Sequence, residues 1–276
     1  MKKDIFSICY LNDVYEDFCF EPKHYVNARR VEDRKMGLRP YRDPDRYSKK
    51  LYEAIRTIWN GKRLPNGEVF SLGEPYCHEF PFGTCWQIDD EEGNFYGSDF
   101  IGPSFTGAYV KLQKNVDSKE EQKINEQLGQ LLYDCRRIGG HIIWPRLGQE
   151  GINLARAVTN DRMDVTLLEL RDFYAKPDGA PLYNAKLRAA FRANRKYLMM
   201  FEDFDGFIDF FMLRDSFVGK NGAVKIFGPI YIEEDERKRD MDRHIYDLFR
   251  PDDYLAFMYE NADAIKRRTE LMSKVC

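Results

Sequence analysis

The sequence lacks both a long apolar run and a secretory leader. No stretch approaches the roughly 18 consecutive apolar residues of a membrane-spanning helix, which excludes a helical membrane protein. The N-terminal residues MKKDIFSICYLNDVYEDF contain two lysines but no apolar core, so we expect no signal peptide. The six cysteines are scattered along 276 residues, which favours free thiols in a reducing compartment. We therefore expect a cytoplasmic protein with no membrane partner.

Positive charge is not in excess either. Lys and Arg number 43 against 46 Asp and Glu, which gives a formal net charge of −3. Binding to a nucleic-acid backbone depends on clustered cations, so the charge balance does not indicate a nucleic-acid partner. The basic residues between 186 and 196 are interpreted as the solvated face of a helix.

Motifs that identify a known chemistry are also missing. The chain has no P-loop, no GxGxxG after a strand, no GxSxG elbow, no HExxH helix and no CxxC pair. Cys77 and His78 are adjacent and Cys85 follows at a distance that fits no common zinc module. We therefore expect no bound metal, and the sequence identifies no cofactor.

What is present predicts a folded α+β protein. Hydrophobic residues make up 43% of the chain and aromatic residues 14%, enough for a sizeable core within one domain. Apolar periodicity and turn signals predict helices at 46–60, 118–138, 163–174, 187–201 and 252–272, and strands at 68–72, 105–113, 141–144, 207–213 and 223–232. This order has no regular βαβ rhythm. We expect residues 1–276 to form a single compact α+β domain, a mixed sheet with several packed helices, with 1–40 as a candidate peripheral segment.

The first candidate functional residue is His141, which follows Gly139-Gly140. Glycines at this position would let a ligand approach the backbone, and the imidazole could move a proton. The structural alternative is that the glycine pair ends the preceding helix and that His141 is a boundary residue.

The segment 146–164 is a second candidate, because it follows a strand and contains a glycine-bearing loop. Arg146, Arg156 and Arg162 could bind phosphate or carboxylate groups beside Asp161, at the start of a helix. In the structural alternative Asp161 or Asp164 caps that helix, and Arg162 pairs with a nearby carboxylate.

Asp209 interrupts the apolar run FIDFFML and is the third candidate. In a strand buried on both faces, its charge would need a partner such as Arg146, Arg156, Arg162 or Arg214. We therefore expect Asp209 to be at least partly buried and bonded, and to serve with His141 as a catalytic group. The alternative is an edge strand that leaves Asp209 in water.

Several co-linear segments resemble a family of bacterial proteins of unknown function. They are DPDRYSKKL (43–51), LPNGEVFSL (64–72), IGGHIIWP (138–145), INLARA (152–157), DRMDVTLLELRDFY (161–174) and FEDFDGFIDFFMLRD (201–215). The resemblance spans about residues 40 to 260. It implies one compact domain in a bacterial cytosol and implies no activity.

Two functional hypotheses follow. The first is an enzyme-like domain whose Arg/His/Asp cleft accepts a phosphorylated or nucleotide-like ligand. The second is a non-catalytic interaction or accessory module of a bacterial stress or defence system, in which the Arg–Asp set is a structural network. A concave pocket with convergent polar groups favours the first, and satisfied buried ion pairs favour the second.

Overall fold

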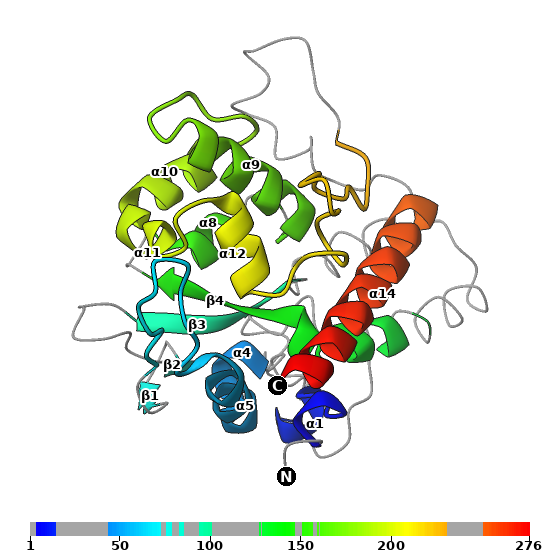
Figure 1. The fold of residues 1–276 in the computed structure, drawn as a ribbon. Coiled ribbons are helices and arrows are strands. Elements are labelled where there is room, and N and C mark those ends of the chain that lie inside the picture. The colour runs from blue at the N-terminus through cyan, green and yellow to red at the C-terminus, as the bar shows by residue number, and fades with distance from the viewer. Residues whose placement is uncertain are drawn as a thin grey trace, which may run out of the picture.

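The computed structural model describes residues 4–14, 44–72, 76–78, 83–85, 94–100, 127, 129–146, 151–156, 159, 161–230 and 251–276. Within these ranges helices dominate (Figure 1). The α-helices are α1 (Leu11–Val14), α4 (Pro44–Tyr47), α5 (Lys49–Trp59), α8 (Ile152–Arg156), α9 (Met163–Ala175), α10 (Ala185–Ala193), α11 (Arg195–Met199), α12 (Phe204–Phe210) and α14 (Pro251–Val275). Two short 3-10 helices are η1 (Asp4–Phe6) and η3 (Ile138–Gly140).

The strands form two separate antiparallel pairs. Strand β1 (Tyr76–His78) pairs with β2 (Gly83–Cys85), and β3 (Asn94–Asp99) pairs with β4 (His141–Arg146). The expected α+β architecture with a mixed sheet is therefore wrong, because the described residues form a mostly helical fold with two strand ribbons. The prediction that the whole chain is one domain remains a prediction.

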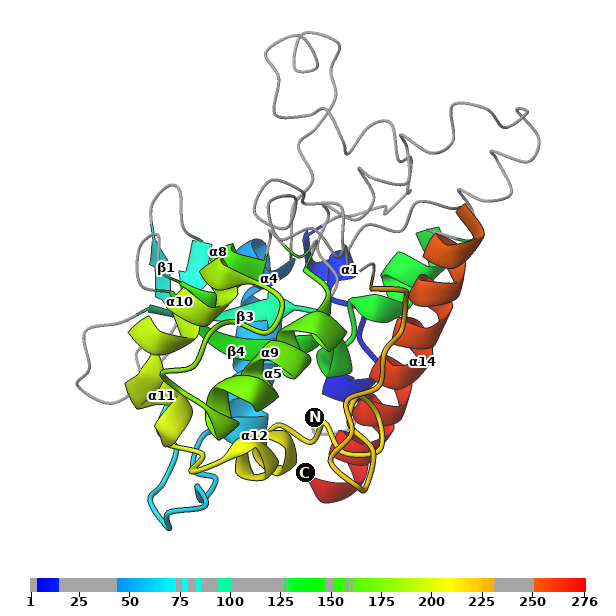
Figure 2. The ribbon, with the colours of Figure 1, turned by 90° about the horizontal axis from the view of Figure 1, so that it is seen from above.

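The β3–β4 ribbon lies between two groups of helices. Figure 1 shows α4 and α5 on one side of the ribbon, α8 to α12 on the other, and α14 along one flank. The view from above places α14 beside the ribbon in the same way (Figure 2). Buried side chains from η3, β4 and all of the longer helices join in one core.

The helices predicted at 46–60, 163–174 and 252–272 are confirmed. Helix α5 begins after Ser48, whose hydroxyl accepts a hydrogen bond from the Leu51 amide at 3.0 Å. Its buried residues include Leu51, Ile55 and Ile58 at helical spacing, as the sequence pattern predicts.

The helix predicted at 187–201 is broken. It forms α10 and α11, which meet at Asn194. The buried Asn194 side chain donates to the Ala190 carbonyl at 2.8 Å, so it competes with the backbone where a continuous helix would run.

The strand predicted at 207–213 is wrong. Asp203 accepts a hydrogen bond from the Gly206 amide at 2.8 Å and so starts helix α12, which takes up Phe204–Phe210. The helix ends in a Schellman turn at Met212, whose φ is 53°, a conformation in which glycine is usual. Two turns of helix are too short to show a helical period, and a run of apolar residues of this length can be either structure.

The apolar run is explained by an aromatic cluster. The Phe201 ring lies 5.2 Å from the Phe207 ring, 5.0 Å from the Phe210 ring and 5.2 Å from the Phe211 ring, centroid to centroid. Trp144 of β4 stacks on Phe207 at 5.4 Å. The apolar residues of α12 are therefore buried against different neighbours, while Asp205 and Asp209 lie on its exposed face.

The four remaining strand predictions have mixed outcomes. Residues 223–232 contribute only an isolated bridge between Val218 and Val224 in the described part, and 68–72 contribute one between Arg63 and Val69, so neither forms the predicted strand. Residues 105–113 lie outside the described ranges. The strand at 141–144 is confirmed as part of β4.

The helix predicted at 118–138 is described at residue 127 and from residue 129 onward, and it ends at residue 135. Leu131 and Cys135 are buried as expected, while Leu128 lies outside the described ranges.

The glycine pair after this helix has a packing role. A Cβ atom at Gly139 would lie 2.3 Å from the Thr269 hydroxyl and 2.4 Å from the Ile265 carbonyl oxygen, both on α14. One at Gly140 would lie 2.0 Å from the Cys135 carbonyl oxygen. The absence of side chains here lets helix α14 pack directly against the backbone of η3.

Candidate functional site

His141 is fully buried at the start of β4. Its ring lies edge-on to Tyr10 at 6.2 Å. The backbone carbonyl of His141 accepts a hydrogen bond from Arg268 at 2.8 Å. The group that approaches the backbone at the glycine pair is therefore the Arg268 side chain of α14, in the same chain.

Arg156 is also fully buried, at the end of α8. Its guanidinium donates to the carbonyl oxygens of Asp161 at 2.7 Å and Phe100 at 3.3 Å. Asp161 is held at a φ of 57°, and its amide donates back to the Arg156 carbonyl at 3.0 Å. Arg156 therefore closes the strained turn that leads into α9.

Arg162 and Asp164 form a fully buried ion pair at the start of α9. Two guanidinium nitrogens of Arg162 contact the two carboxylate oxygens of Asp164, at 3.1 and 2.6 Å. Arg162 also donates to the carbonyls of Gly228 and Pro229, both at 2.7 Å, and Asp164 accepts from the Phe227 amide at 3.1 Å. The pair fastens the 227–229 segment onto α9.

This arrangement bears on the structural alternative for the 146–164 segment, in which an aspartate caps the helix and Arg162 is paired. The predicted pairing of Arg162 with a nearby carboxylate is confirmed. The N-cap position of α9 is occupied by Arg162, without a side-chain cap bond, so neither Asp161 nor Asp164 is the N-cap. Arg146 is the last residue of β4, opposite Asn94, and its side chain lies outside the described part.

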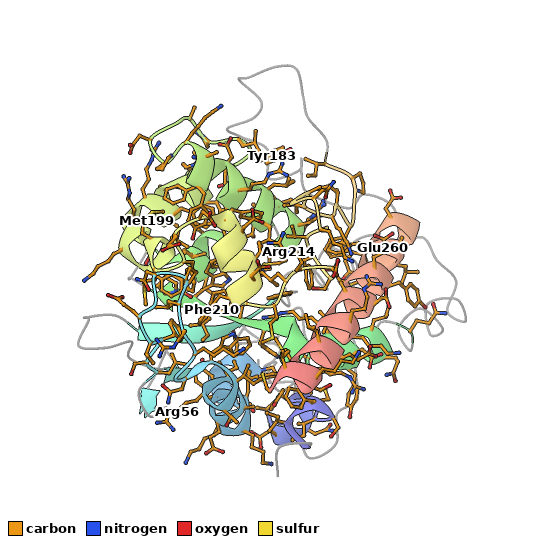
Figure 3. The ribbon with its side chains drawn as sticks, in the orientation of Figure 1. Arg56, Tyr183, Met199, Phe210, Arg214 and Glu260 are labelled. Atoms are coloured by element: carbon orange, nitrogen blue, oxygen red, sulfur yellow. The ribbon has the colours of Figure 1, made fainter. Side chains whose placement is uncertain are left out.

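Asp209 lies on the exposed face of α12, with 61% of its side chain accessible, so the expected burial is wrong. The expected arginine partner is confirmed as Arg214, whose Nε donates to Asp209 at 2.7 Å. Arg214 also donates to Asp205 at 2.7 Å and lies beside α12 (Figure 3). The hydrogen bond to Asp209 is the main cause of a raised pKa for Arg214, so this arginine stays charged. An exposed cluster of this kind contributes little to stability.

A stronger buried network, which is not among the sequence candidates, surrounds Glu169. This carboxylate, fully buried on α9, accepts hydrogen bonds from the Leu182, Tyr183 and Asn184 amides at 3.1, 2.7 and 3.3 Å. Arg188 of α10 donates to it at 2.7 Å and also contacts Asp172. In the sequence, Glu169 falls at helical spacing from Thr166 and Phe173, which places its carboxylate on the buried face of α9.

Arg268 is another buried charge that is absent from the sequence candidates. It donates to the Phe211 carbonyl at 3.0 Å and to the Gly139 and His141 carbonyls at 2.8 Å. Its guanidinium also lies 4.9 Å from the Phe100 ring centroid. Burial lowers the pKa of Arg268 to about 9, which leaves the group charged at neutral pH. Arg268 ties α14 to η3, β4 and the end of α12.

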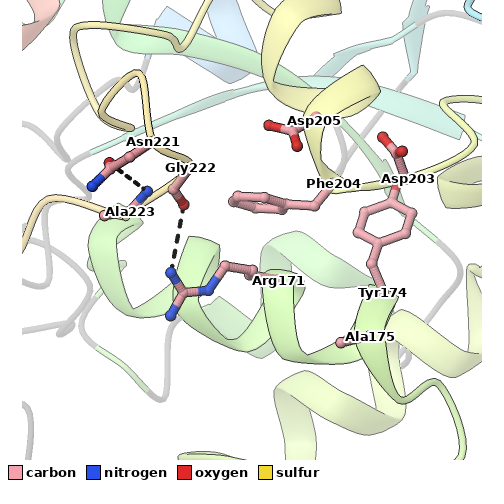
Figure 4. Close-up of a pocket in the computed structure, with 9 residues that line it drawn as sticks. All are labelled: Arg171, Tyr174, Ala175, Asp203, Phe204, Asp205, Asn221, Gly222 and Ala223. Carbon is pink, nitrogen blue, oxygen red and sulfur yellow. Dashed lines mark hydrogen bonds between the residues drawn. The ribbon is translucent and has the colours of Figure 1, made fainter.

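A hollow of about 490 Å³ opens at the surface between α9, the start of α12 and the 221–223 turn. It is lined by Arg171, Tyr174, Ala175, Asp203, Phe204, Asp205, Asn221, Gly222 and Ala223 (Figure 4). Charged groups of both signs surround the rings of Tyr174 and Phe204. Burial, with a smaller effect from the charge of Asp203, raises the pKa of Tyr174, so its phenol stays neutral and donates to the Leu198 carbonyl at 2.6 Å.

The residues of this hollow were not among the sequence candidates. They come from three segments far apart in the chain, and none of them belongs to a recognised motif. Of the sequence candidates, Arg156, Asp161 and Arg162 lie together around the start of α9, His141 is in the interior, and Asp209 is exposed on α12. Their catalytic and ligand-binding roles remain predictions.

Comparison with known proteins supports the resemblance seen in the sequence. The model of a family of unknown function, DUF6994, matches residues 27–272. The chain belongs to the DUF6994 family. The match includes every described element from α4 to α12 and most of α14. The chain matches no curated protein and no solved structure.

Cys9 of this DUF6994 chain is a buried, free cysteine. Burial raises the pKa of the Cys9 thiol to about 11, which makes it a poor nucleophile. No group of three or more His, Cys, Asp or Glu side chains among the described residues could hold a metal ion. No described helix has both the length and the apolar character needed to cross a membrane.

Proposed function

We propose that this DUF6994 chain is a cytosolic, non-catalytic binding module that accepts a small polar ligand in the hollow between α9, α12 and the 221–223 turn. The hollow carries the ligand-binding part of the proposal, and the contacts that the buried arginines make within the chain carry its non-catalytic part. Its volume of about 490 Å³ falls within the range of roughly 300–1,000 Å³ typical of ligand sites. It presents Arg171 and Asp203 around two aromatic side chains.

Its walls are held in fixed positions, which favours binding because little conformational entropy is lost. Helix α9 is held to α10 by Glu169 and Arg188, at 2.7 Å. The start of α12 is capped by Asp203, and the 221–223 turn is closed by Asn221, whose side chain accepts from the Ala223 amide at 3.1 Å.

The contacts of the buried arginines support a structural role for them. Arg156 and Arg162 already bind carbonyl and carboxylate oxygens of the chain itself. His141 and Asp209, the two groups predicted to move a proton, lie in different surroundings. His141 is buried and Asp209 is exposed. This is the pattern expected of the interaction-module hypothesis.

The charges of the hollow also bear on the ligand. Asp203 and Asp205 both line it, and Arg171 is the single cation among the described residues of the lining. A nucleotide carries several negative charges, which two carboxylates would repel at this distance. We therefore infer that the ligand is small and polar but not polyanionic.

The test is a comparison of two arginine variants in a thermal-shift screen over nucleotides, sugar phosphates, amino acids and short peptides. Arg171→Gln should keep the melting temperature of the wild type and abolish stabilisation by any ligand. Arg162→Met should lose roughly 3–5 kcal/mol because it leaves Asp164 buried without a cation, while the folded fraction keeps its ligand response.

Arg195→Gln is the matched control, because Arg195 is 52% exposed and lies outside the lining. If Arg162→Met prevents folding, Arg162→Lys retains the positive charge and takes its place. Loss of the ligand response in the folded Arg162 variant, together with its retention in Arg171→Gln, would contradict the proposal.

A further inference from the structure

Arg171 and Asp203 are the two charges of the hollow that have no ion-pair partner among the described residues. Arg171 donates only to the Gly222 carbonyl, at the long distance of 3.5 Å. Asp203 accepts from the Gly206 amide at 2.8 Å. Both side chains line the hollow, and both residues are exposed.

The other charged groups nearby are compensated. Asp205, the third charged residue of the lining, is bound by Arg214, which also holds Asp209. Deeper in the same helix layer, Glu169 is bound by Arg188. One unpaired cation and one unpaired anion therefore remain at the hollow.

The surface between these two charges is aromatic. In Figure 4 the Phe204 ring lies between Arg171 and Asp203, and the Tyr174 ring lies beside Asp203. Phe204 is 8% exposed, and the Tyr174 hydroxyl is already engaged with the Leu198 carbonyl. This part of the hollow suits an apolar segment of a ligand.

We propose that the hollow binds a zwitterion, such as a short peptide or an amino acid, whose carboxylate pairs with Arg171 and whose ammonium group pairs with Asp203. This inference rests on the proposed function and specifies its ligand class. A carboxylate matches the planar guanidinium geometry. An ammonium group beside a carboxylate and aromatic rings gains from both the ion pair and the ring faces. The hollow exceeds the roughly 30 Å³ share of one water more than tenfold, which leaves room for a dipeptide.

Isothermal titration with the full-length chain tests the inference. The zwitterions are glycylglycine, 4-aminobutyrate and 6-aminohexanoate, which differ in the span between their charges. The analogues with one charge are butyrate and butylamine, at matched ionic strength. At least one zwitterion should bind about tenfold or more tightly than either analogue, because it makes both ion pairs.

Two charge-removing variants complete the test. Arg171→Gln and Asp203→Asn should each reduce the affinity for the zwitterion to that of a singly charged analogue. Asparagine is as good an N-cap as aspartate, so Asp203→Asn should leave α12 intact. The matched controls are Arg195→Gln and Asp178→Asn, a pair at 3.7 Å outside the hollow, which should bind as the wild type does.

Equal affinity for the zwitterions and the analogues, or no binding of any zwitterion, overturns the inference. If a ligand of another class then stabilises the wild type but not Arg171→Gln, the proposed function survives. If no ligand of any class depends on Arg171, the proposed function fails as well.

Discussion

Replacing Glu169 with alanine is expected to lower the free energy of unfolding by about 3–5 kcal/mol. The change leaves the buried guanidinium of Arg188 with Asp172 but without the fully buried carboxylate that it contacts at 2.7 Å. It also removes the acceptor of three backbone amides at 182–184, each of which then has to find water. Urea denaturation followed by circular dichroism measures the effect.

The same variant offers a specific control. Removing the carboxylate leaves a space surrounded by three amides and a guanidinium, which is an anion site. Formate or acetate should therefore raise the melting temperature of Glu169→Ala more than that of the wild type, by mass action. Asp178→Ala, at a side chain that is 87% exposed, should change stability little. An unchanged free energy of unfolding in Glu169→Ala would show that the network does not hold α9 and α10 together.

Gly139→Ala is expected to cost at least about 3 kcal/mol, the upper end for overpacking. The new methyl group would lie 2.4 Å from the Ile265 carbonyl oxygen and 2.8 Å from the Thr269 amide nitrogen. Because these are backbone atoms of α14, the whole helix has to shift. The shift would disturb the bond from Arg268 to the Gly139 carbonyl, now 2.8 Å long. Thermal and urea denaturation measure the loss.

Gly219→Ala is the matched control for this prediction. Its Cβ would meet the end of the Asn221 side chain at 3.0 Å and no closer atom, so at most the exposed hydrogen bond between Asn221 and the Ala223 amide has to adjust. We expect this variant to stay within about 1 kcal/mol of the wild type. A Gly139→Ala protein as stable as Gly219→Ala would contradict the close approach of α14 to η3.

Long helices with one apolar face could be predicted from the sequence. Helix α5 has a serine cap and a single buried stripe, so its period is clear. Helix α14 runs for 25 residues, which gives the pattern several turns in which to appear. The strand β4 was also found, because an apolar segment follows the glycine pair.

Segments whose environment is set by distant residues could not be predicted. Helix α12 has seven residues, and its phenylalanines are buried by Trp144 and Phe201 as well as by each other. Nothing in a local pattern separates this from a buried strand. The same limit explains Asp209, whose exposure follows from the helical geometry of α12.

The residues of the candidate site also divide into those that the sequence indicated and those that only the fold brings together. The arginines near 156–162 were recognised as important, but whether they bind a ligand or the chain depends on what packs around them. The carbonyls of Gly228 and Pro229, far along the chain, are the groups that Arg162 binds. Arg171 and Asp203 are common surface residues in the sequence, and only the fold places them around one hollow.

Alanine methyl groups lie at both candidate sites, namely the hollow and the arginines near 156–162. Ala175 and Ala223 line the hollow, whereas Ala155 lies beside Arg156 in α8. Ala189 is an exposed reference on α10. A methyl-labelled protein can therefore report the position of a bound ligand in a single spectrum.

The most direct measurement is a titration of alanine-methyl-labelled wild-type protein with 4-aminobutyrate, glycylglycine and each ligand that stabilises it. We expect concentration-dependent shifts of the Ala175 and Ala223 methyl resonances, with those of Ala155 and Ala189 unchanged. A shift of the Ala155 resonance while Ala175 and Ala223 stay fixed would contradict it, and so would the absence of any shift at Ala175 and Ala223.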